Sequence, residues 1–216
     1  MNIQNRKNMK NKRSNRSTNG KNTEFYIVYT VVFLLIALFL YLRFYLNGKS
    51  LVWSHDGVPQ HLNSLAYYGR YLRGILYTIF VEHRLSIPMW DLHIGYGSDI
   101  LTTLHYYVIG DPLTLLAVFC PSSKTEILYE FLIFLRIYLA GIAFSRYCFY
   151  HKNSRQATFM GCMIYIFAGW TIYAAMKHPY FSNPMIYLPL ILMGIDKIYK
   201  KEKPYLFIWS VAVAGL

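Results

Sequence analysis

The chain alternates between long apolar runs and polar segments, and the first run is the clearest. Residues 25–46 (FYIVYTVVFLLIALFLYLRFYL) are 22 consecutive positions with a single charge, Arg43, close to the end. At about 1.5 Å per helical residue, such a run crosses a hydrocarbon core roughly 30 Å thick. The long stem of Arg43 lets its guanidinium reach the interface. The pattern therefore predicts a first transmembrane helix over residues 25–46.

Further apolar runs predict a multi-pass bundle. We expect a second span over residues 127–150, a third over 156–175, a fourth over 180–198 and the start of a fifth at 204–216. The fifth run is still apolar at Leu216 and has about 13 residues, too few to cross a bilayer, so we expect a fragment of a longer protein. The predicted fold class is all-α, a polytopic membrane helical bundle.

Positive charge is concentrated beside these runs. Residues 1–24 hold seven of the 22 Lys and Arg residues and predict a disordered basic tail, and four more lysines lie between positions 197 and 203. Because Lys and Arg favour the cytoplasmic side of a membrane, we expect a cytoplasmic N-terminus and a cytoplasmic loop at 151–155. Residues 47–126 then form an extracytoplasmic loop with amphipathic helices.

Composition agrees with a membrane protein and argues against other classes. Hydrophobic residues make up 55% of the chain and charged residues 15%, against about 25% charged residues in soluble domains. The net charge of +12 comes without a basic stripe on a folded face, so we expect no nucleic-acid partner. The three cysteines lack metal or redox spacing, and no nucleotide-binding loop or zinc motif is present. We expect no cofactor, and nothing in the sequence supports a divalent cation.

The outer segment contains two patterned stretches. Residues 60–80 repeat leucine and isoleucine at helical spacing and predict an amphipathic helix in the headgroup plane. Residues 100–120 are apolar, but Gly110-Asp111-Pro112 interrupts them. A charge and a helix breaker at the bilayer centre are costly, so we expect two short interfacial or re-entrant elements there rather than a span.

Several charged residues have competing interpretations. Arg136 lies inside the second expected span and is a functional candidate for that reason, with Glu130 as a poorly spaced candidate partner. Asp91, Asp99 and Asp111 lie beside Gly, Pro or aromatic residues and predict turns.

The candidate chemistry begins about eight residues beyond the first span, at Ser54-His55-Asp56-Gly57-Val58-Pro59-Gln60. An acid just above the outer leaflet can take a proton from an acceptor hydroxyl, or help to hold a cation beside a phosphate. The simpler interpretation is that Asp56 only caps the helix that begins near Pro59. The spacing alone leaves both interpretations open.

The order of these motifs resembles the start of the YfhO family of bacterial multi-pass membrane proteins, over residues 25–216. The resemblance rests on the basic tail, the first span, D-G-x-x-Q, Pro88-Met89-Trp90-Asp91, Gly95-Tyr96-Gly97-Ser98, residues 106–112 and the span around Gly141. It implies a GT-C-like glycosyltransferase of the bacterial cell membrane. Such an enzyme uses a polyprenyl-phosphate sugar donor to modify an extracytoplasmic cell-envelope polymer or lipid. A catalytic acid follows the first helix in that fold, and Asp56 is the matching position.

The resemblance also directs attention to the next outer loop, residues 176–183. GT-C proteins often carry a second acid there, whereas this loop has none, which puts a two-carboxylate metal site in doubt. His178 is therefore the candidate acid or base of the loop, and Lys177 is a candidate phosphate contact. An ordinary interfacial loop explains both residues equally well.

The remaining candidate substrate-binding residues are Gln60, Arg70, Arg73 and Trp90. The arginines suit a phosphate or lipid headgroup, and Trp90 suits a sugar ring. A solvated helix face and an interfacial aromatic belt explain the same residues without a ligand.

Two other functions remain open from the sequence. A multi-pass transporter or permease component without covalent chemistry needs polar residues at the membrane midplane, whereas here they concentrate beyond the first span. A non-catalytic scaffold follows if Asp56 is only a helix cap.

Overall fold

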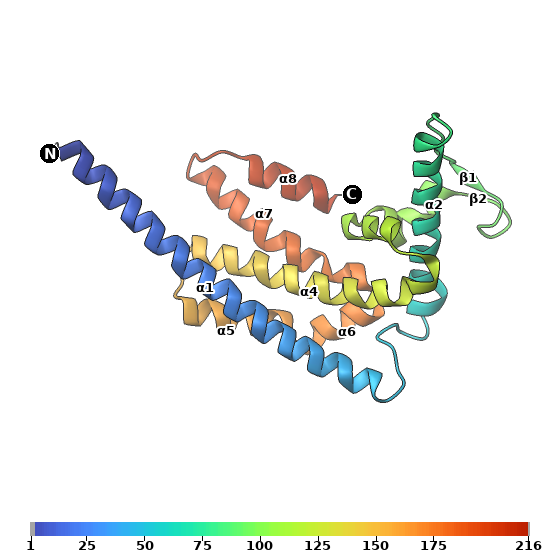
Figure 1. The fold of residues 1–216 in the computed structure, drawn as a ribbon, viewed down its shortest axis with the longest axis horizontal. Helices are drawn as coiled ribbons and strands as arrows, with labels where there is room; N and C mark the ends of the chain where they lie inside the picture. The colour runs from blue at the N-terminus through green and yellow to red at the C-terminus, as the bar shows by residue number, and fades with distance from the viewer. Residues whose placement is uncertain (1–2, 216) are drawn as a thin grey trace.

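The structure is a computed structural model that describes residues 3–215, with side chains from position 22 onward. The long helices form a bundle, and α2 stands crosswise at one end of it (Figure 1). The α-helices are α1 (Ile3–Tyr45), α2 (Asn63–Phe80), α3 (Ile100–Leu104), α4 (Thr125–Tyr150), α5 (Arg155–Ile166), α6 (Gly169–Lys177), α7 (Pro184–Tyr199) and α8 (Tyr205–Ala214). The shorter turns are η1 (Gly57–Leu62), η2 (His105–Ile109), η3 (Pro112–Phe119), η4 (Ser122–Lys124) and η5 (Pro179–Ser182). The strands β1 (Trp90–Asp91) and β2 (Ser98–Asp99) form one small antiparallel pair.

Apolar length decides which helices can cross a bilayer. Two stretches qualify among the described residues, Asn22–Tyr45 and Ser122–Tyr150, and a bent pair formed by α5 and α6 qualifies if it counts as one span. The first two coincide with the first two expected spans. α7 has 16 residues and α8 has 10, so each is shorter than the roughly 20 residues of a full span.

The third expected span, residues 156–175, is two helices rather than one. α5 and α6 meet at an angle of 44°, because Ala168 adopts an extended conformation with a ψ of 144°. Thr171 Oγ1 donates a hydrogen bond of 3.1 Å to the Tyr165 carbonyl oxygen near the end of α5. A side-chain hydroxyl therefore helps to satisfy the backbone at the break.

The N-terminal segment also differs from the expectation of a disordered tail over residues 1–24. α1 continues without a break from Ile3 to Tyr45, and residues 1 and 2 lie outside the described part of the chain. No proline occurs before Pro59, and the apolar half of α1 supplies a helical nucleus. Further residues then need only helix propagation, which is much less costly than nucleation.

The core of the bundle meets α1 along one narrow stripe. Phe25, Tyr29, Phe33 and Ala37 recur at every fourth position and are buried. Tyr29 Oη donates a hydrogen bond of 2.8 Å to the Tyr138 carbonyl oxygen in α4. A Cβ at Gly141 would overlap that hydroxyl, so glycine is needed where the two helices approach.

The segment between α1 and α4 contains the expected amphipathic helix, as η1 running into α2. The predicted break at Gly110-Asp111-Pro112 is present, since η2 ends at Ile109 and η3 begins at Pro112. Asp111 accepts a hydrogen bond of 2.9 Å from the Leu113 backbone N–H at the start of η3. Asp91 makes its predicted turn by accepting from the His93 N–H at 2.8 Å, whereas Asp99 caps α3 by accepting from the Thr102 N–H at 2.6 Å.

Candidate functional site

Asp56 lies at the end of the bundle where α2 stands, immediately before η1. It occupies the N-cap position of η1, but its side chain makes no capping hydrogen bond. Its Oδ2 instead lies 3.6 Å from Nε2 of His178, and the two side chains are 30% and 21% exposed. The two residues predicted to be catalytic are therefore neighbours, and both remain accessible to a substrate.

A third residue, His61, belongs to the same site and was not predicted. Its Nε2 lies 2.9 Å from Nδ1 of His178, and it is buried, with 3% of its surface exposed. Burial, followed by the nearby His178 and then Arg136, lowers the pKa of His61 from 6.5 to about 4 despite the opposing effect of Asp56. His61 is therefore neutral near pH 7. We call Asp56, His61 and His178 the acid–histidine cluster.

The contacts of the cluster run through both ring nitrogens of His178. On one side, Nε2 of His178 lies 3.6 Å from Asp56 Oδ2, an ionic contact that is longer than a hydrogen bond. On the other side, Nδ1 of His178 shares a hydrogen bond of 2.9 Å with Nε2 of His61, in which either nitrogen can donate, and the hydroxyl of Tyr180 lies 3.4 Å from the same Nδ1. Because Asp56 and His61 contact opposite nitrogens of His178, these three side chains are not arranged around one cation. The described residues contain no group of three or more His, Cys, Asp or Glu suited to a metal.

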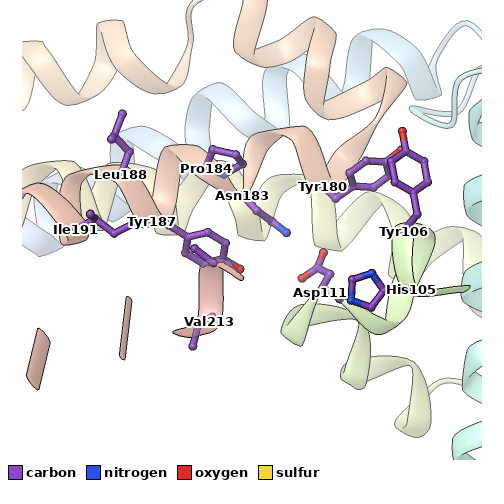
Figure 2. Close-up of a pocket in the computed structure, with 12 residues that line it drawn as sticks. His105, Tyr106, Asp111, Tyr180, Asn183, Pro184, Tyr187, Leu188, Ile191 and Val213 are labelled. Atoms are coloured by element: carbon purple, nitrogen blue, oxygen red, sulfur yellow. The ribbon is translucent and has the colours of Figure 1, made fainter. Parts of the chain in front are cut away.

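A cleft of about 440 Å³ lies beside the cluster, between α7, α8 and the turn at residues 105–111 (Figure 2). One end is polar and carries His105, Asp111 and Asn183, whereas the other carries aliphatic side chains such as Leu188 and Val213. Tyr180 connects the cleft to the cluster. It lines the cleft, and its ring centroid lies 5.1 Å from that of His61.

A buried ion pair lies at the polar end of the cleft, where Asp111 is part of the lining. Arg136 Nη2 pairs with Asp111 Oδ2, and both side chains are at most 5% exposed. Arg136 Nε also donates to Asn183 Oδ1 at 3.1 Å. The pairing is thus formed between three different elements, α4, the turn before η3, and the turn before α7.

Glu130, the poorly spaced candidate partner of Arg136, does not pair with it. Glu130 Oε1 accepts instead from the Leu51 backbone N–H at 3.0 Å and from Ser50 Oγ at 3.2 Å. The reason is helical geometry: side chains meet at spacings of three and four residues, and a spacing of six turns the two side chains to different faces. Glu130 therefore anchors the segment that follows α1.

The predicted substrate-binding residues fall into separate places. Arg70 and Trp90 line a second cleft of about 490 Å³ on the outer face of α2, together with Tyr67 and Asp91. A hydrogen bond from the Tyr67 hydroxyl is the main cause that lowers the pKa of Asp91 to about 2, so this second cleft carries a carboxylate at neutral pH.

The other three predicted residues lie elsewhere. Arg73 donates to the carbonyl oxygens of Ala117 at 2.9 Å and Cys120 at 2.5 Å, so it closes the end of η3. Gln60 is half-buried on η1, next to His61 in the chain. Lys177 ends α6 beside His178, with its Nζ 5.8 Å from the centre of the Tyr173 ring.

The sequence carried only weak signals for the residues that were missed. His61 is a single histidine on the buried face of an amphipathic helix, without a spacing typical of catalysis. Asn183 follows a short loop and precedes a proline, as many helix-start residues do. Their importance comes from tertiary contacts with His178 and Arg136.

Comparison with known proteins gives a family-level result. The family described as "Bacterial membrane protein YfhO" matches residues 28–214. No curated protein and no solved structure matches the chain.

Proposed function

The chain belongs to the YfhO family of bacterial membrane proteins, and on that premise we propose that it is a GT-C-type glycosyltransferase. It takes a sugar from a polyprenyl-phosphate donor and transfers it to an extracytoplasmic cell-envelope polymer or lipid. The observation that carries the proposal is the approach of Asp56 Oδ2 to His178 Nε2, at 3.6 Å. A carboxylate that makes no capping bond and lies beside a histidine is suited to proton transfer.

The reaction assigns one role to each member of this pair. The hydroxyl oxygen of the acceptor attacks the anomeric carbon of the donor, and the bond between that carbon and the phosphate oxygen breaks. Polyprenyl phosphate leaves with the bonding electrons, and Asp56 takes the hydroxyl proton. His178, with Nε2 3.6 Å from Oδ2 of that carboxylate, holds it in position through an ionic contact.

The cleft of Figure 2 has the chemistry of the donor. Its aliphatic end suits a hydrocarbon chain, and His105 and Asn183 at the other end suit a phosphate. Tyr180 would then lie against the sugar, next to the acid–histidine cluster. Lys177 adds a cation beside His178 for the phosphate, and Gln60, Arg70 and Trp90 are assigned to the acceptor side.

The test is a transfer assay with the intact protein. The protein is reconstituted into liposomes with radiolabelled polyprenyl-phosphate hexoses and with extracts of cell-envelope polymers and lipids. We expect label to leave one of the donors and to appear on an acceptor, only when the protein is present. Stable donors in every combination would contradict a transferase.

One observation favours a second candidate, a transporter without covalent chemistry. Arg136, Asp111 and Asn183 form a buried polar group within the bundle, and transporters place such groups at the helix interfaces that bind substrate. The same liposomes separate the two functions. A transporter would move a lipid-linked or soluble sugar across the membrane and leave its glycosidic phosphate bond intact.

A further inference from the structure

A small cavity lies beside the acid–histidine cluster, with His61 in its wall. Its volume is about 20 Å³, and His61, Tyr129 and Arg136 are among the residues that line it. His61 Nδ1 and Tyr129 Oη are both buried without a hydrogen-bond partner in the protein. Each of these residues is 97% buried, since only 3% of its surface is exposed. Two residues that each carry an unpaired polar atom therefore line the same cavity.

The cavity has the size and chemistry that a water molecule needs. About 10–15 Å³ of accessible space is enough for one water, provided that two or more polar partners surround it. Here a water can donate to His61 Nδ1 and accept from the Tyr129 hydroxyl, with the Arg136 guanidinium on the same wall. Buried polar atoms are rarely left unpaired in native proteins, so one bridging molecule accounts for both.

We propose that one ordered water occupies this cavity, and that His61 is a positioning residue that holds His178 in its Nε2–H tautomer. The water donates to Nδ1 of His61, which leaves the proton of that imidazole on Nε2. That proton is donated to Nδ1 of His178, and the proton of His178 is then on Nε2, facing Asp56. The catalytic consequence rests on the proposed function, whereas the water and the two tautomers do not.

The surroundings keep His61 neutral while this chain operates. The groups that face it are His178 and Tyr180 from the α6–α7 connection, Tyr107 from η2, Tyr129 and Arg136 from α4, and Asp56 before η1. Arg136 is held by Asp111, and burial is the largest effect on His61. His61 therefore stays neutral near pH 7 and acts on the reaction through the tautomer of His178.

The first test needs no substrate. The intact protein, labelled with ¹⁵N-histidine in lipid nanodiscs, is studied by NMR at pH 7.5, and His61→Gln and His178→Gln assign the two side chains. We expect both imidazoles to carry their proton on Nε2. A proton on Nδ1 of either ring would overturn the proposal, whatever the activity of the protein.

The second test separates positioning from a merely structural role. His61→Gln keeps an amide N–H where the imidazole donates, whereas His61→Leu removes the donor. We expect His61→Leu to lower kcat by about 10- to 100-fold with little change in KM, and to shift the pH profile, while His61→Gln keeps most of the wild-type rate. Equal losses in both variants with an unchanged pH profile would overturn the positioning role.

The third test concerns the water itself. If the cavity is dry, Tyr129→Phe removes an unpaired hydroxyl and raises the melting temperature of the detergent-solubilised protein. If the water is present, Tyr129→Phe removes one of its hydrogen-bond partners and lowers the melting temperature. We also expect Tyr129→Phe and His61→Leu to be non-additive in a double-mutant cycle, because the water couples them. A raised melting temperature for Tyr129→Phe, or full additivity, would overturn the water.

Discussion

His178 Nε2 lies 3.6 Å from Asp56 Oδ2, although one residue precedes η1 and the other follows α6. The loop that carries His178 contains no acid, so a histidine rather than a second carboxylate faces Asp56. A carboxylate beside an imidazole can pass a proton without a second carboxylate. Substitution of Asp56 tests the catalytic role that we propose for this carboxylate and its histidine neighbour.

We expect Asp56→Asn to abolish sugar transfer and to leave abundance and membrane insertion nearly unchanged. Asparagine has the same size and can still occupy an N-cap, but it takes no proton at neutral pH. Loss of a general base lowers the rate by about 10²–10⁴-fold. The measurement is donor turnover in liposomes, with Asp99→Asn as the matched control because Asp99 caps α3. Full activity of the Asp56 variant would leave that residue with only its N-cap position.

The distribution of Lys and Arg predicts which loops face outward. Leu85 and Asn153 are both exposed in the structure, one in the long loop and one in the α4–α5 connection. In a variant without Cys120, Cys148 and Cys162, an impermeant maleimide added to intact cells should label Leu85→Cys and leave Asn153→Cys unmodified. The reverse pattern would show that the orientation is inverted.

Separating Asp111 from Arg136 should destabilise the protein strongly. Arg136→Met leaves a buried carboxylate without its cation, a change that costs about 3–5 kcal/mol in buried pairs. The double variant Asp111→Asn/Arg136→Gln removes both charges, so we expect it to recover much of the loss. The loss and the recovery of stability are measured as melting temperatures of the detergent-solubilised variants. Arg84→Met is the control, since Arg84 is 64% exposed in its pair with Glu82 and should cost at most about 1 kcal/mol.

Acidification should weaken the fold through His61. Its pKa falls from 6.5 to about 4 in the folded protein, so the unfolded state binds more protons between these two values. Stability is therefore retained above pH 6.5 and decreases as the pH falls toward 4, by up to about 3 kcal/mol. The slope of melting temperature against pH should be smaller in His61→Gln. An identical slope in the two proteins would contradict the assignment.

The contact between α7 and α8 should depend on Gly194. A Cβ at this position would lie 2.7 Å from the backbone nitrogen of Phe207, so Gly194→Ala pushes the helices apart. Overpacking of this kind typically costs about 1–3 kcal/mol. Gly169→Ala is the control because a Cβ there meets nothing within 4 Å. Equal melting temperatures for the two variants would mean that the close approach is absent.

The sequence alone predicts a structural feature where one local property, such as apolar length or a helix breaker, determines it. The length of the apolar runs predicts the spans of α1 and α4, and a charge followed by proline predicts the break between η2 and η3. Local pattern alone did not select Asp56 and His178; the family resemblance selected them, and the structure places the two side chains 3.6 Å apart.

Tertiary contacts determine the features that the sequence did not reveal. Arg136 is paired with Asp111 rather than Glu130 because the turn before η3 folds onto α4. His61 becomes part of the site only when η5 brings His178 within 2.9 Å of it. The bend between α5 and α6 depends on the extended conformation of Ala168, which hydropathy does not report.

The buried stripe of α1, formed by Phe25, Tyr29, Phe33 and Ala37, also determines the position of this helix along the membrane normal. Its outward side chains, such as Leu34 and Leu38, are more than half exposed, and acyl chains accommodate them at any height, so hydrophobicity alone does not select one vertical register. The bond from Tyr29 Oη to the Tyr138 carbonyl oxygen does select one, because a slide by one helical turn would displace the hydroxyl by about 5.4 Å. Tyr29, together with the hydrogen bond of 2.9 Å between Thr30 Oγ1 and the Tyr138 hydroxyl, thus fixes the height of α1 against α4 and with it the start of the segment that leads to Asp56.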